Sequence, residues 1–198
     1  METKHLTPEE SFSIIDKAIA NFKMNYKETS KSFLLWGWLL TFASFSNFII
    51  LNILNSKEAY ELMGLYSLGN WGVFILIGFI GMIFMERKIN KVKKVYSHLD
   101  GYSKSLWTVT AASFFIATFL CFQLGIDPPS IMLLIAGIAT TTSGLLIKFR
   151  PMVIGGMAFF VFSIATTLVA NEYITLMVGG AIICGYLIPG YLLKSAKE

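Results

Sequence analysis

Long apolar runs alternate with short polar stretches along most of the chain, and each run has the length of a membrane-spanning helix. A helix needs roughly 20 apolar residues to cross about 30 Å of hydrocarbon. No Asp, Glu, Lys, Arg or His stands in the middle of any run. The pattern predicts six transmembrane helices, at about residues 33–54, 68–85, 106–124, 129–147, 151–170 and 173–193.

The later runs are joined by short polar stretches, at residues 125–128, 148–150 and 171–172. Joints of this length force neighbouring helices to run antiparallel. Pro151 suits the first turn of the helix that it starts. We therefore expect an all-α fold in which residues 32–198 form one bundle of three antiparallel transmembrane hairpins.

A shorter amphipathic pattern precedes the first apolar run. Thr7, Pro8 and Glu10 make a typical helix start, with an N-cap, a first-turn proline and an acidic residue at the third position. The apolar residues that follow step by three or four positions, which places them on one face of a helix. We interpret residues 1–31 as a separate cytoplasmic amphipathic helix. Its docking seam for a partner is Phe12, Ile15, Ile19, Phe22 and Tyr26.

A second seam follows the second run. Apolar residues at positions 85, 89, 92, 96 and 99 step in the same way, so the second span is expected to continue as a cytoplasmic helix over residues 86–100. Asp100 and Gly101 are expected to break that helix. Ile89, Val92 and Tyr96 therefore join the docking seam, and the two seams are expected to pack on each other, within one chain or across a dimer.

The basic residues set an orientation. All of the 16 lysine and arginine residues except Lys57 fall on one side of the expected membrane. Because cytoplasmic loops carry the excess of Lys and Arg in membrane proteins, that side is expected to be cytoplasmic, with both chain ends there. The formal net charge of +4 is then a consequence of topology, and no nucleic-acid partner is expected.

The loop after the second run is polybasic. Such a segment next to a membrane attracts anionic lipid, by about 1 kcal/mol for each charge. The alternative is that these charges only fix the topology. The candidate lipid headgroup contacts are Arg87, Lys88, Lys91 and Lys94.

Hydroxyl and amide groups gather at a few places within the runs. The fourth run is the most polar, with three threonines followed by Ser143. In lipid, a buried amide such as that of Asn47 needs hydrogen-bond partners. One interpretation is ordinary helix packing, with each group bonded to its own helix or to the next. The other is a polar cavity lined by Asn47, Thr110, Thr140 and Ser143.

Pro189 interrupts the last run. Its missing N–H leaves the carbonyl of Gly185 without the usual helical donor, and its ring disfavours a straight helix. The sequence predicts a kink at this point, either static or acting as a hinge.

The residues needed for catalysis are scarce. The only histidines are His5 and His98, both in polar segments, and no ionisable residue lies deep in a run to activate a nucleophile or couple a proton. Cys121 and Cys184 have no metal-binding spacing. The apolar fraction of 55% with 14% charged residues indicates a membrane protein, and the six spans leave too few residues for a separate soluble domain that could supply the missing groups. We expect no enzyme, no catalytic residue, no metal and no cofactor.

Three stretches carry a resemblance to a known family: FLLWGW at 33–38, SGLLIKFRPMVIGG at 143–156 and GYLIPGYLL at 185–193. They resemble a family of small six-span membrane proteins from Bacteroidetes-type bacteria, and the resemblance covers most of the chain. It implies the bacterial inner membrane and carries no activity with it. The spacing of Gly and Pro also looks distantly like the HdeD-type acid-resistance membrane proteins, from which no residue role is transferred.

The sequence therefore predicts a non-enzymatic integral membrane protein. The first hypothesis is a scaffold or regulatory partner that works through its two cytoplasmic seams, with a cytoplasmic or membrane protein or a second copy of the chain as partner. The second is a transporter or channel for a neutral or apolar small solute. The lipid bilayer is a partner in both.

Overall fold

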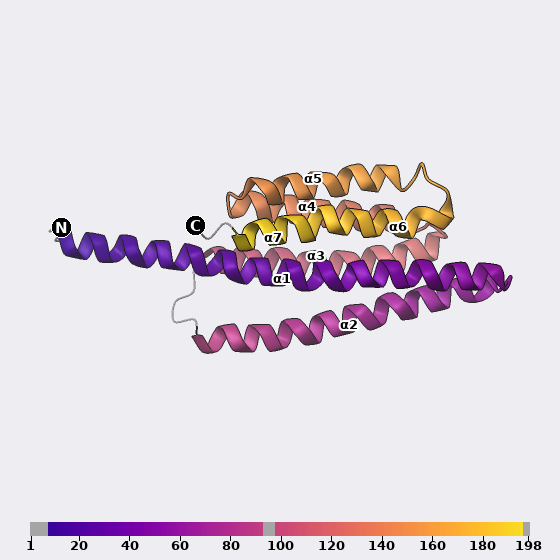
Figure 1. Ribbon diagram of the computed structural model, residues 1–198, viewed down its shortest axis with the longest axis horizontal. Coiled ribbons are helices and arrows are strands. Elements are labelled where there is room, and N and C mark those ends of the chain that lie inside the picture. Colours follow the sequence, from indigo (N-terminus) through magenta and orange to yellow (C-terminus); the bar gives the residue numbers. More distant parts are fainter. Residues whose placement is uncertain (1–7, 93–97, 196–198) are drawn as a thin grey trace.

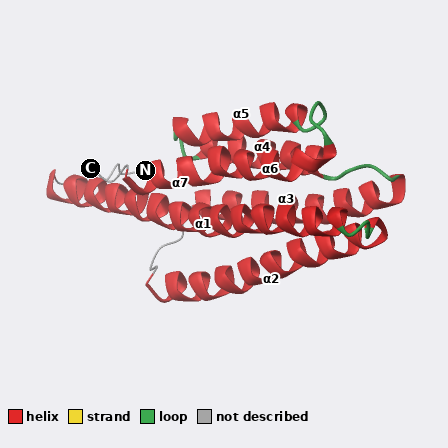
Figure 2. Cartoon of the chain, turned by 45° about the vertical axis from the view of Figure 1, so that its right-hand side comes forward, coloured by secondary structure: helices red, strands yellow, loops and turns green. Residues whose placement is uncertain are grey.

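The computed structural model describes residues 8–92 and 98–195, with side chains described for residues 29–88 and 101–195. Every regular element in these residues is helical (Figures 1 and 2). The elements are α1 (Pro8–Ser56), α2 (Tyr60–Val92), α3 (His98–Leu124), α4 (Pro129–Leu146), α5 (Arg150–Ala165), α6 (Asn171–Ile182), the π-helical turn η1 (Ile183–Leu187) and α7 (Ile188–Ser195).

Within the described residues, five helical segments are long and apolar enough to cross a membrane. They are Thr29–Ser56, Tyr60–Lys88, Gly101–Leu124, Pro129–Leu146 and Asn171–Ser195. The sixth apolar helix is α5, which has 16 residues. The all-α prediction is therefore confirmed, with five to six helices of membrane-spanning character.

Helix α1 is one uninterrupted helix of 49 residues. At roughly 1.5 Å per residue it is about 73 Å long. Its first part projects past the ends of the other helices (Figure 1). The expected division between a cytoplasmic helix and the first span is therefore absent from the backbone. The polar residues at 27–32 include no Gly or Pro that would end a helix.

Helices α1 and α2 form an antiparallel pair joined by a tight turn at 57–59. In this turn Glu58 takes a left-handed backbone conformation with φ of 55°. The main partner of α2 is α1, and Figure 1 shows α2 diverging from the rest of the bundle toward its C-terminal end. In the described residues, α2 therefore packs mainly on this one helix.

The interior lies between α1, α4, α5 and the last helical segment α6–η1–α7. The most extensive contact is that of α4 with α5, where a β-carbon on Gly144 would meet the Val153 amide nitrogen at 2.7 Å. Phe159 and Met152 of α5 are among the largest fully buried side chains. Small residues at these crossings allow the backbones to approach without a side chain between them.

Helix α5 is shorter than the expected fifth span. Helix α5 ends at Ala165 rather than near residue 170. The Thr166 and Thr167 hydroxyls donate to the carbonyls of Ser163 and Ile164 three residues earlier, a pattern that competes with helix continuation.

The interruption expected at Pro189 takes the form of a π-helical turn. The N–H of Ile188 donates to the carbonyl of Ile183, five residues earlier, and Pro189 follows. A π-turn inserts one extra residue, so the helix passes the proline and continues to Ser195.

The expected helix break at Asp100 and Gly101 is wrong. Helix α3 begins at His98 and runs through both residues. An acidic residue in a first helical turn is favoured by the helix dipole, so this Asp suits a helix start better than a helix end. Helix α2 continues past its span as expected, to Val92, and residues 93–97 lie outside the described part of the chain.

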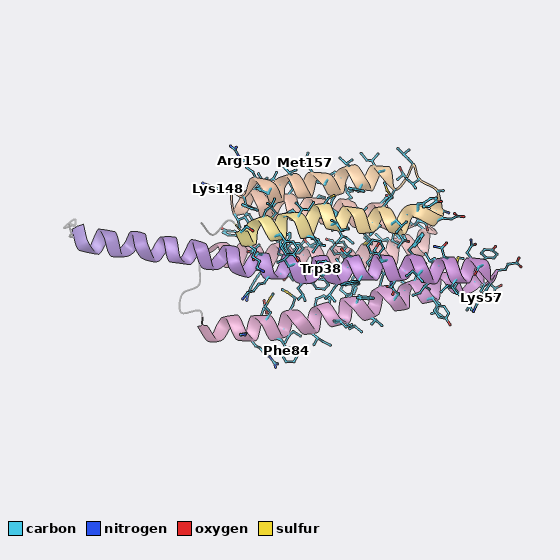
Figure 3. The ribbon with its side chains drawn as sticks, viewed as in Figure 1. Trp38, Lys57, Phe84, Lys148, Arg150 and Met157 are labelled. Carbon is cyan, nitrogen blue, oxygen red and sulfur yellow. The ribbon has the colours of Figure 1, made fainter. Side chains whose placement is uncertain are left out.

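The outward surface of α2 and α3 is strongly apolar. Phe84, Phe115 and Phe122 are each more than 60% exposed. The charged residues labelled in Figure 3 lie at the ends instead, with Lys57 at one end of the bundle and Lys148 and Arg150 at the other. Such a surface is consistent with a multi-pass helical bundle in lipid. The end that carries the α4–α5 turn and Ser195 is called the basic end below.

Candidate functional site

Most hydroxyl groups in the described helices are bonded to their own helix. Thr110 donates to the carbonyl of Leu106 at 2.8 Å, four residues earlier, and Ser113 donates to that of Val109 at 2.9 Å. Thr142 donates to that of Ile138 at 2.7 Å. This bond satisfies a hydroxyl without help from a neighbour.

Helix α4 departs from this pattern over one turn. The hydroxyl oxygens of Thr140, Thr141 and Ser143 are buried and have no hydrogen bond of normal geometry in the structure. Thr141 packs its oxygen on the backbone of Gly156, where close packing accounts for its position. Thr140 has the phenol of Tyr186 beside it. Ser143 is left as a buried polar group in need of a partner, which is costly in an apolar interior.

Thr140 lies next to the phenol of Tyr186 on η1. The ring of Tyr186 is held edge-on by Phe33 of α1, with ring centroids 5.3 Å apart, and by Phe159 of α5 at 4.9 Å. Phe33 in turn meets Trp107 of α3 at 5.8 Å. Four helical segments, α1, α3, α5 and η1, thus supply an aromatic cluster, and a fifth, α4, places the Thr140 hydroxyl beside its phenol.

A small recess opens one helical turn from Thr140, toward the basic end. Its volume is about 30 Å³. Pockets for organic ligands measure about 300–1,000 Å³, so this recess is far too small for one. It is lined by Thr29, Ser103, Trp107, Ser143, Leu146 and Ile147.

The expected cavity residues do not share one site. Thr140 and Ser143 lie one turn apart on α4 and both are buried. Thr110 is buried on α3 but already bonded to its own helix. Asn47 lies about 21 Å along α1 from Phe33, counted at roughly 1.5 Å per residue, so it is remote from the Tyr186 cluster.

Asn47 sits in a second polar region, on the face of α1 that meets α6. One turn away, Ser44 is fully buried and donates to the carbonyl of Thr175. The side-chain oxygen of Asn47 is buried and has no partner. The structure therefore divides the expected polar cavity into two separate regions.

The docking seam remains a prediction. Its five N-terminal residues belong to α1, and Ile89 and Val92 belong to the last part of α2, but their side chains lie outside the described set. Tyr96 lies outside the described residues altogether. The expected packing between the two seams is not tested by the structure.

The candidate lipid contacts are described in part. Arg87 and Lys88 are exposed near the C-terminal end of α2. Lys91 belongs to the same helix, without a described side chain, and Lys94 lies outside the described residues.

Sequence reasoning missed the polar contact between α1 and α2. The Asn70 amide donates to the carbonyl of Ala43 at 2.8 Å, and the Ser46 hydroxyl donates to the Asn70 oxygen at 2.7 Å. Asn70 is the sole amide in the second apolar run, which is the signal that could have identified it. Tyr186 was also missed, since one tyrosine in an apolar run carries no distinctive pattern.

No group of three or more His, Cys, Asp or Glu residues that could hold a metal ion occurs in the described part of the chain. Cys121 is buried and Cys184 is half-buried, and both are free thiols. No protein-family model, curated protein or solved structure matches the chain.

Proposed function

We propose that the chain is a multi-pass protein of the bacterial inner membrane, with six spans in three antiparallel hairpins and both ends in the cytoplasm. Helix α5 counts as the sixth span because it starts at the basic end, after the α4–α5 turn, while α6 begins at residue 171 and returns to that end. The basic end faces the cytoplasm on the strength of the Lys and Arg distribution.

We propose further that it acts as a non-enzymatic scaffold or regulatory partner. The observation that carries this proposal is the continuity of α1. The segment Thr29–Ser56 has the length and hydropathy of a membrane span. The preceding 8–28 segment continues the same helix beyond the bundle and carries the N-terminal docking seam. A rigid helix that presents an apolar seam outside the membrane is suited to pair with another helix.

The partner is expected to supply an amphipathic helix, either from another protein or from a second copy of this chain. The seam repeats every three to four residues over residues 12–26, and this spacing fits a short coiled-coil contact.

Site-specific photo-crosslinking tests this proposal. A photoreactive residue at Ile19, in the centre of the seam, is expected to give a defined crosslinked product in membranes. The same residue at Lys17, off the seam, is the matched control. Crosslinks from Ile19 that disappear in Phe22→Glu support the seam as a docking surface. The absence of any product from Ile19, or equal products from both positions, would contradict it.

A transporter of a small neutral solute is the second candidate. It is favoured by the buried side-chain oxygens of Ser143 and Asn47, which have no hydrogen-bond partner in the structure. If the molecule conducts a solute such as urea, flux into proteoliposomes is expected to fall in Thr140→Val and Asn47→Leu. Flux that survives both substitutions argues against a path along these residues.

A further inference from the structure

Ser143 differs from most other hydroxyl residues because it is buried without a hydrogen-bond partner. Only 6% of its surface is exposed, and its side-chain oxygen has no hydrogen-bond partner. Its neighbour Thr142, at the same depth, bonds to its own helix at 2.7 Å. A helical serine can satisfy itself in that way, but Ser143 does not in this structure, so its oxygen is a buried polar group that calls for another partner.

The recess beside Ser143 has the size and chemistry of a water site. A cavity needs about 10–15 Å³ of such volume to hold a water, so about 30 Å³ accommodates one or two. A buried water also needs two to four polar partners, and three of the six lining residues carry hydroxyls: Thr29, Ser103 and Ser143. Each comes from a different helix, α1, α3 and α4.

We propose that this recess is a water-binding site that hydrates the junction of α1, α3 and α4 at the basic end. Rotation about χ1 turns the Ser143 oxygen between staggered positions at low cost, which brings it to the recess. The bound water accepts and donates hydrogen bonds among the three hydroxyls. Solvent then reaches within one helical turn of Thr140 and the phenol of Tyr186.

Trp107 reports on this site, because its side chain lines the recess and its ring packs on Phe33. X-ray radiolysis of the intact protein in nanodiscs generates hydroxyl radicals from bound water, and these oxidise side chains next to it. Trp107 is expected to be oxidised several-fold faster than Trp36, whose ring lies against α2. Ser143→Leu fills the recess and is expected to bring the Trp107 rate down to that of Trp36.

A second measurement does not depend on a bulky substitution. In a Cys121→Ala, Cys184→Ala background, Ser143→Cys is nearly isosteric. Hydrogen peroxide is close to water in size, and it reacts with a thiol only as the thiolate in contact with water. Ser143→Cys is expected to react, although it is buried. Thr142→Cys is the control. Residue 142 lies at the same depth but does not line the recess, so its thiol is expected to remain unmodified.

Two results overturn the proposal. One is a Trp107 oxidation rate no higher than that of Trp36 in the unaltered protein. The other is a Ser143→Cys thiol that stays as unreactive as Thr142→Cys. Neither result bears on the docking seam, whose crosslinking test is read at residue 19.

Discussion

The ring of Trp36 on α1 lies directly over the backbone of Gly78 on α2. A β-carbon built on Gly78 would come within 2.5 Å of the ring, and Trp36 also meets Phe79 edge-on at 5.6 Å. One turn farther, Gly81 faces Leu35 in the same way, with a β-carbon contact of 3.2 Å. Two glycines thus give α2 its close approach to α1, the helix on which it mainly packs.

Gly78→Leu is therefore expected to weaken the α1–α2 pair. Overpacking of this kind costs about 1–3 kcal/mol of unfolding free energy, because the ring and the backbones must move apart. Reversible unfolding in mixed micelles of increasing dodecyl sulfate measures the change. Gly72→Leu is the matched control, since a β-carbon there meets nothing within 4 Å. Equal losses in the two variants would show that the Trp36 contact is not responsible.

The hydrogen bonds of Asn70 are expected to stabilise the same pair of helices. Asn70→Leu removes the bonds to Ala43 and Ser46 and is expected to lower the free energy of unfolding by about 1 kcal/mol, typical of interhelical hydrogen bonds in membranes. Asn52→Leu is the control, because Asn52 bonds only to Phe48 of its own helix. A double-mutant cycle of Asn70→Leu with Ser46→Ala should give a non-zero coupling energy, and a coupling of zero contradicts the contact.

Asn47 is expected to behave in the opposite way. Its side-chain oxygen is buried without a partner, and relieving such a group gains about 1–3 kcal/mol if the replacement fits. Leucine has a similar size, so Asn47→Leu is expected to raise the unfolding free energy. Ser44→Ala, one turn away, removes a hydrogen bond to Thr175 and is expected to lower it. Destabilisation by both variants would indicate that Asn47 has a partner in the membrane.

Lys148 ends α4 in a left-handed conformation, with φ of 54°. This geometry lets the next amide, that of Phe149, donate to the carbonyl of Gly144 at 2.9 Å. The conformation costs a residue with a β-carbon about 1–2 kcal/mol, and glycine adopts it freely. Lys148→Gly is expected to stabilise the protein by up to about 1 kcal/mol in the same unfolding assay.

Lys148→Ala separates the backbone effect from the charge. It removes the ammonium group but keeps the strained conformation, so it is expected to leave the stability close to that of the unaltered protein. If Lys148→Ala stabilises as much as Lys148→Gly, the loss of charge and not the backbone is the cause.

The apolar runs predicted the helices well because membrane spans are set by local composition. The fourth run, expected at 129–147, matches α4 at Pro129–Leu146. Helix ends were predicted less well, because they depend on specific hydrogen bonds. The hydroxyls that end α5 bond to carbonyls, and nothing in the apolar pattern of that run reports them.

The polar groups were found by residue type but not by position. Thr140 and Ser143 were identified together because they share one turn of one helix. Asn47 was assigned to the same cavity, although the packing of α1 on α6 places it at another depth. Which residues lie at the same depth depends on the axial position of each helix relative to its neighbours. A single sequence does not determine those relative positions.

The packing of α1 on the last helical segment also determines when the fold can close. The Ser44 hydroxyl finds its acceptor at Thr175, 131 residues later in the chain. At about 5–20 residues per second, a ribosome needs on the order of 10 s to supply that acceptor. During that interval α1 has α2 as its main helical neighbour and also contacts α3, through Phe33 and Trp107. A chain released before Asn171 lacks the segment that completes its interior, and such a product is expected to be recognised by membrane quality-control proteases.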